Sequence, residues 1–97
     1  MEELLIMKLI NYLDSIVFGG KVLLKGEYVD YPIFKTKKDG NSLKKYIYLD
    51  VEVGKIEDAQ LVTNTGEILS QKNFNITKNQ DGIVIVFEFK IDVEEVI

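Results

Sequence analysis

The side chains that could do chemistry in this chain are carboxylates, lysines and hydroxyls. Its 97 residues contain no histidine, no cysteine and no arginine. These absences exclude thiolate and imidazole ligands for zinc, cysteine nucleophiles and serines activated by histidine. A serine activated by lysine stays open, although nothing in the sequence positions such a pair. Most nucleophile–base chemistry is therefore excluded by composition alone.

The carboxylates form three neighbouring pairs, namely Asp50 with Glu52, Glu57 with Asp58, and Glu94 with Glu95. A glycosidase-like pair needs a cleft that separates the two pKa values, and nothing in so short a chain indicates a cleft. Weak calcium binding by such neighbours stays open, but the Asp39–Asn41 segment lacks the later ligands of a calcium loop. We therefore predict no catalytic residue, no metal site and no cofactor, and we expect a protein that is not an enzyme.

Lysines and tyrosines gather around one predicted turn at 38–42. The lysines are Lys35, Lys37, Lys38, Lys44 and Lys45, and Tyr46 and Tyr48 follow them. The lysines could simply guard an edge strand, or they could contact an acidic partner. Tyrosine beside lysine can stack on bases, but it is also typical of protein interfaces. A net charge of −4 and the lack of arginine favour protein over nucleic acid. Our candidate protein interface here is Lys35, Lys37, Lys44, Tyr46 and Tyr48.

The elements that must position these groups begin with a helix at 2–17. Apolar residues recur at spacings of three and four in two adjacent stripes. The first stripe is Leu5, Leu9, Tyr12 and Ile16; the second is Ile6, Ile10, Leu13 and Val17. The predicted polar face is Lys8, Asn11 and Ser15, with Asp14 at its edge. Gly19 and Gly20 are interpreted as the helix cap, because a phosphate-binding loop would open a helix instead of closing one.

Leu4 and Met7 widen the apolar surface of this helix beyond what one sheet contact requires. A chain of this size has a modest core, and burial against another subunit would add stability. We therefore add Leu4 and Met7 to the candidate interface. The helix is expected either to meet another subunit or to serve only its own core.

From residue 21 the apolar period changes to two, which predicts strands. The predicted strands are 21–25, 28–37, 44–53, 56–63, 67–72, 74–78 and 83–93. Pro32 marks an edge or a bulge, and apolar residues on both faces of 83–93 predict a central strand. The prediction is an α+β fold in one domain, 1–97: an amphipathic helix packed on an antiparallel sheet of about five to seven strands. The sheet could be a meander, a small sandwich or a partly open barrel.

The chain shows no secretory signal, because Met1 is followed by glutamates instead of a basic stretch. Its longest apolar-rich stretch, 4–18, is too short and too polar to span a bilayer. The acidic balance also disfavours binding to anionic membranes and to nucleic acid. We expect a protein that is cytoplasmic at synthesis and has a protein partner or forms a homo-oligomer.

Three segments in the second half share a hairpin pattern, "YIYLDVEVG" at 46–54, "AQLVTNTGEIL" at 59–69 and "DGIVIVFEFKI" at 81–91. The pattern resembles the tail, baseplate and fibre-associated β domains of phages of low-GC bacteria. The resemblance implies a virion component, and it carries no functional residues with it. The leading hypothesis is a non-enzymatic assembly or interaction protein. The alternatives are a phage-encoded inhibitor of a host defence protein and a small ligand-binding domain.

Overall fold

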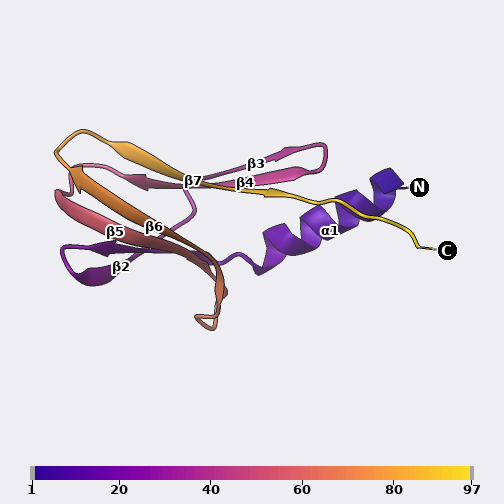
Figure 1. The fold of residues 1–97 in the computed structure, drawn as a ribbon, viewed down its shortest axis with the longest axis horizontal. Helices are drawn as coiled ribbons and strands as arrows, with labels where there is room; N and C mark the ends of the chain where they lie inside the picture. The colour runs from indigo at the N-terminus through magenta and orange to yellow at the C-terminus, as the bar shows by residue number, and fades with distance from the viewer. Residues whose placement is uncertain (1, 97) are drawn as a thin grey trace.

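The computed structural model describes residues 2–96, which form one helix and seven strands (Figure 1). They are α1 (Glu2–Ile16), β1 (Gly19–Leu24), β2 (Glu27–Tyr31), β3 (Lys35–Asp39), β4 (Ser42–Leu49), β5 (Gly54–Val62), β6 (Ile68–Lys78) and β7 (Ile83–Lys90). The predicted α+β fold with an antiparallel sheet and an N-terminal helix is confirmed. The segments predicted separately at 67–72 and 74–78 form the single strand β6.

The strands form two antiparallel sheets, ordered β2-β1-β5-β6 and β3-β4-β7. Side chains of both sheets pack into one core that includes Val22, Ile56, Ile47 and Phe87, so the fold is an open sandwich and not a closed barrel. The predicted strand 28–37 is broken near Pro32, which lies in the connection between the sheets. Its two halves, β2 and β3, each form an edge.

Gly20 of β1 lies against a side chain of the other sheet. A Cβ atom added there would lie 2.2 Å from Cδ1 of Ile47 and 3.2 Å from the carbonyl oxygen of Gln60. The predicted glycine cap is wrong, because Gly19 and Gly20 begin β1 and neither has a positive φ. Gly20 is needed in β1 for space between the layers, and not for a left-handed turn.

Two predictions about the three-stranded sheet are wrong, one on the position of β7 and one on the length of β4. β7 was predicted to be central, but β4 is the central strand and β7 lies at an edge. There the ammonium of Lys72 donates to the carbonyl oxygen of Val86 and approaches the Phe87 ring, with 5.1 Å from Nζ to the ring centroid. β4 ends at Leu49, so Val51 and Val53 are exposed in a connection instead of facing the core.

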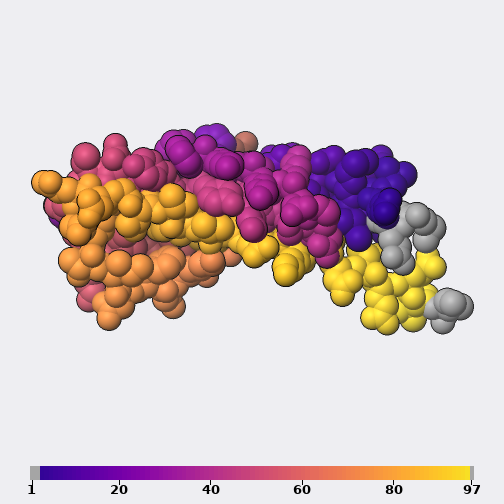
Figure 2. Space-filling model, turned by 90° about the horizontal axis from the view of Figure 1, so that it is seen from above, coloured from indigo at the N-terminus to yellow at the C-terminus, as the bar shows by residue number. Residues whose placement is uncertain are grey.

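The molecule is elongated, with extents of 51 × 25 × 20 Å. α1 projects from the four-stranded sheet and lies beneath the β3–β4 hairpin, at the end opposite the β6–β7 turn (Figure 1). Figure 2 looks onto the outer side of the three-stranded sheet and shows α1 at the same end of the body. α1 therefore contacts the sandwich along one side only, chiefly through β4.

Candidate protein-interaction surfaces

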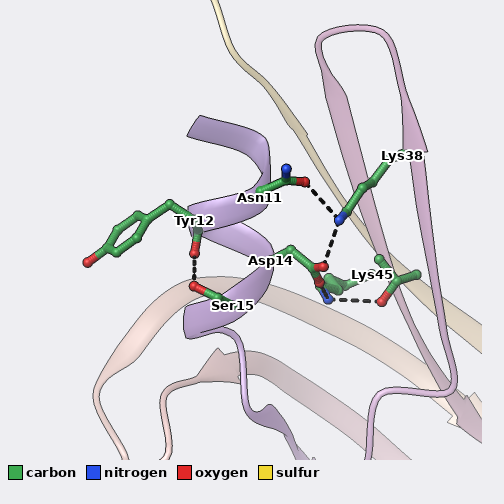
Figure 3. Close-up of polar contacts among 7 residues, drawn as sticks. Asn11, Tyr12, Asp14, Ser15, Lys38 and Lys45 are labelled. Atoms are coloured by element: carbon green, nitrogen blue, oxygen red, sulfur yellow. Dashed lines mark hydrogen bonds and ion pairs between the residues drawn. The ribbon is translucent and has the colours of Figure 1, made fainter. Parts of the chain in front are cut away.

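The inner side of α1 carries the second predicted apolar stripe. Ile10 and Val17 are buried, and Ile6 and Leu13 are half-buried. Asn11 and Asp14 were predicted to lie on a polar face directed toward solvent. Instead, both contact the β3–β4 hairpin (Figure 3). The helix is therefore held to the hairpin by apolar packing and by polar contacts on one flank.

Asp14 is the centre of these polar contacts. Its carboxylate forms ion pairs with Lys45 and with Lys38, the second at 2.9 Å. Lys38 also donates to the amide oxygen of Asn11, and Lys45 donates to the Thr36 hydroxyl at 2.9 Å. Lys45 is only 3% exposed because it lies on the same face of β4 as the core residues Leu43 and Ile47. A buried ammonium requires such partners, so Asp14 satisfies a charge that the sandwich itself cannot.

The ion pairs shift the pKa of Asp14 downward. The hydrogen bond from Lys45 is the largest cause, the Lys38 contact adds to it, and partial burial opposes both. Because the folded pKa lies below the unfolded one, the contribution of Asp14 to stability is present above about pH 4 and is lost as the pH falls through the folded pKa. We expect wild-type stability to fall more steeply below pH 4 than that of Asp14→Asn. Urea unfolding of both proteins from neutral to acidic pH measures this; parallel curves would contradict it.

The other apolar stripe of α1 faces outward. Leu5 is 44% exposed, Leu9 39% and Tyr12 65%, and Tyr12 points away from the hairpin (Figure 3). Leu4 and Met7, predicted from sequence as interface residues, are also exposed, nearer the start of the helix. We call Leu5, Leu9, Tyr12 and Ile16 the outer stripe, of which Ile16 is half-buried and the other three are exposed. The helix thus turns a carboxylate and an amide toward its own protein and large apolar side chains toward solvent.

The outer stripe leads to an exposed Phe18, just beyond the end of α1, which is 70% exposed. Two hollows of about 440 and 420 Å³ adjoin its side chain. The second is lined by Ser15–Phe18 together with Thr63, Asn64 and Glu67. Our sequence prediction did not single out Phe18, because only the tertiary structure places the β5–β6 turn beside it.

The remaining predicted residues lie on the outer side of the three-stranded sheet. In the strand register Lys35 is opposite Tyr46, and Lys37 is opposite Lys44. The ammonium of Lys35 lies 5.7 Å from the centre of the Tyr46 ring. The structure brings together five of the seven candidate residues here, and we call them the lysine–tyrosine face: Lys35, Lys37, Lys44, Tyr46 and Tyr48.

This face includes an exposed aromatic pair that sequence analysis missed. The rings of Phe34 and Tyr48 are 5.2 Å apart, and Val84 lies opposite Tyr48 in the register. Within residues 2–96, no carboxylate lies within ion-pair distance of Lys35, Lys37 or Lys44. Lys44 lies between Lys37 on β3, a like charge that is unfavourable, and Glu88 on β7, an opposite charge that offsets it in part. An acidic partner would therefore add most beside Lys35 and Lys37.

Glu57 and Asp58, which are neighbours in sequence, lie in different environments. Glu57 is exposed, whereas Asp58 is buried and accepts hydrogen bonds from Tyr28, Gln60 and Gln71 at 2.6, 3.4 and 2.7 Å. The bond to Asp58 raises the pKa of the Tyr28 hydroxyl. The described residues, 2–96, contain no cluster of three acidic groups that could hold a metal ion.

Asp50 and Glu52 lie in the β4–β5 connection instead of on a strand face. The Tyr48 hydroxyl donates to Asp50 and the Tyr31 hydroxyl donates to Glu52 at 2.7 Å. The Tyr31 bond is the largest cause of a lowered pKa at Glu52, and burial raises the pKa of Tyr31. These carboxylates bind the chain's own hydroxyls, and the two surfaces described above are the better candidates for function.

Comparison of the chain with protein-family models, with curated proteins and with solved structures finds no match. No helix in the part of the chain that the structure describes is long and apolar enough to cross a membrane.

Proposed function

We propose that this chain is a non-enzymatic assembly protein that binds a protein partner through the outer stripe of α1. One observation carries the proposal: Leu5, Leu9 and Tyr12 face solvent while Asp14 of the same helix faces the protein. A helix that served only its own core would bury the apolar side and expose the carboxylate. Contiguous exposed apolar side chains of this size mark protein contacts in soluble proteins.

The lysine–tyrosine face supports a second contact in the same assembly. Lys45 and Lys38 point toward α1, whereas Lys35 and Lys44 lie on the opposite side of the same sheet. The two surfaces therefore face in different directions, and a partner on one leaves the other accessible. Aromatic and charged groups together suit a partner that offers carboxylates beside apolar side chains.

The finer form of the proposal is that the assembly is a phage particle. The hairpin pattern of the second half supports it; the three segments that carry the pattern overlap β4, β5, β6 and β7. Detection of the chain in purified virions by mass spectrometry would support this location. Exclusion from virions, together with rescue of phage growth in a defended host, would favour the inhibitor instead.

The stripe can be tested by placing a charge at its centre. Leu9→Lys should abolish stripe-dependent binding of a protein partner, because an ammonium would have to be desolvated in an apolar contact. Val51→Lys is the matched control, since Val51 is exposed in the β4–β5 connection. We expect co-purification of the partner with the wild type and with Val51→Lys, but not with Leu9→Lys. Equal recovery with all three proteins would overturn the proposal.

A further inference from the structure

We propose that the occupant of the outer stripe is α1 of a second copy of this chain, packed antiparallel across a two-fold axis. This inference rests on the proposed function, because it names the partner of the same surface. A two-fold interface uses the same patch on both copies, so the patch must be complementary to itself. The spacing, the charges and the location of α1 meet that requirement.

The spacing of the outer stripe matches a helix–helix seam. Leu5, Leu9, Tyr12 and Ile16 are separated by four, three and four residues, which is the alternation of the a and d positions of a heptad. The positions beside the seam toward the core, Ile6 and Leu13, are apolar and half-buried. A second helix with the same spacing could therefore pack along the solvent side of the stripe.

Antiparallel packing pairs the stripe with itself without opposing like charges. Leu9 of each copy would pack against Tyr12 of the other, and Leu5 against Ile16. Lys8 is the one charged residue beside the seam on the solvent side, and it would lie opposite Ser15 of the second copy instead of another lysine. Antiparallel helices also align their dipoles favourably.

The location of α1 favours the same arrangement. The helix forms one end of an elongated molecule (Figures 1 and 2), so two copies can overlap their helices with the sandwiches at opposite ends. The first turn of the second helix would then reach Phe18 and the hollow of about 420 Å³ beside it. This explains why an exposed phenylalanine and a hollow lie at the end of the stripe.

The apolar area agrees with that of a small stable dimer. From their exposed fractions, Leu5, Leu9, Tyr12 and Phe18 offer on the order of 500 Å² of surface per copy. A standard interface buries about 800 Å² per partner, of which roughly 60% is apolar. The stripe and Phe18 therefore supply about the apolar share that a specific interface needs, and the flanking polar side chains supply its rim.

The chain lacks cysteine, so disulfides can form only between introduced cysteines. Single introduced cysteines therefore report how the two helices are aligned. The experiment uses the full chain carrying Leu5→Cys, mixed with the full chain carrying Ile16→Cys, and oxidises the mixture. Antiparallel packing predicts the mixed Leu5→Cys/Ile16→Cys disulfide in excess over either self-disulfide. Val51→Cys is the control for random collision. Sedimentation of the cysteine-free chain measures the dimer directly, and Leu9→Lys should weaken it by roughly tenfold or more.

Each outcome decides the proposal. A dimer that Leu9→Lys dissociates and Val51→Lys does not, with the mixed disulfide in excess, supports it. A dimer with excess Leu5→Cys self-disulfide is parallel and overturns it. A monomer at every concentration also overturns it; if a different protein still binds in a Leu9-dependent manner, the proposed function survives without the dimer. A monomer without Leu9-dependent binding removes both. Circular dichroism confirms that each variant is folded.

Discussion

Replacing Asp14 with asparagine should lower the free energy of unfolding by about 3 kcal/mol, whereas replacing Lys45 with methionine should change it by less than about 1 kcal/mol. The two substitutions differ in effect because Asp14 and Lys45 have different remaining partners for their charges. Lys45 is buried and has Asp14 as its only carboxylate within the described residues 2–96, so Asp14→Asn leaves an uncompensated ammonium. Asp14 keeps Lys38 when Lys45 is removed, and methionine can fill the apolar side of β4.

Urea unfolding of the single variants and of the double variant Asp14→Asn/Lys45→Met measures these changes in the free energy of unfolding. The double variant should recover most of the stability lost in Asp14→Asn, because it removes the buried charge together with its partner. Lys38→Met is the matched control: it removes the more exposed lysine from the same carboxylate and should cost less than about 1 kcal/mol. Equal losses for Asp14→Asn and Lys45→Met would contradict our account of the pair.

The same ion pair explains how the outer stripe becomes available. Asp14 and Asn11 attach one flank of α1 to the hairpin, and this fixes the rotation of the helix about its axis. With that rotation fixed, Ile10 is buried and Leu9 and Tyr12 remain outside. The ion pair and the burial of Ile10 therefore act together to keep the same apolar stripe packed on the protein.

Local patterns in the sequence located the helix and most of the strand segments, but not the pairing of the strands. The helix at 2–17 and the strand alternation followed from spacing, and Pro32 marked an edge correctly. Strand order depends on contacts between distant residues. Val84 and Val86 make both faces of β7 apolar, which predicted a central strand, yet β7 is an edge strand with Val84 exposed. Gly19 and Gly20 were misinterpreted because the side chain that requires Gly20 to be small, Ile47, lies in the other sheet.

For the candidate surfaces too, local patterns predict some features, and others depend on contacts between distant residues. Alternation along β4 already separates Lys44, Tyr46 and Tyr48 from the aliphatic positions. The same alternation places Lys45 among the core residues Leu43 and Ile47, a signal that grouping the lysines by sequence proximity overlooked. The partner of Lys45 is 31 residues away on the helix, and no local pattern predicts that pairing. Sequence therefore identified the widened apolar helix, but only the tertiary structure shows which stripe is outside.

The second large effect is expected at the other buried lysine, Lys78, which is 3% exposed at the end of β6. Its ammonium donates to three backbone carbonyl oxygens, those of Asp50, Glu52 and Asn79, at 2.5, 2.5 and 2.8 Å. Lys78→Met should lower the free energy of unfolding by about 3 kcal/mol, because the carbonyls lose their donor and the connection between β4 and β5 loses its attachment. Lys45 and Lys78 are thus two buried lysines for which the same substitution should change stability to very different extents.

The reason for this contrast lies in what each lysine leaves behind. Removing Lys45 leaves a carboxylate that still pairs with another lysine, whereas the carbonyls that Lys78 joins belong to a fixed backbone and have no second side-chain donor within residues 2–96. Lys55→Met is the control, since Lys55 is exposed on the neighbouring strand. Hydrogen exchange should accelerate at residues 50–53 in Lys78→Met alone. If Lys78→Met and Lys55→Met have the same unfolding midpoint, the three carbonyl contacts do not stabilise the connection.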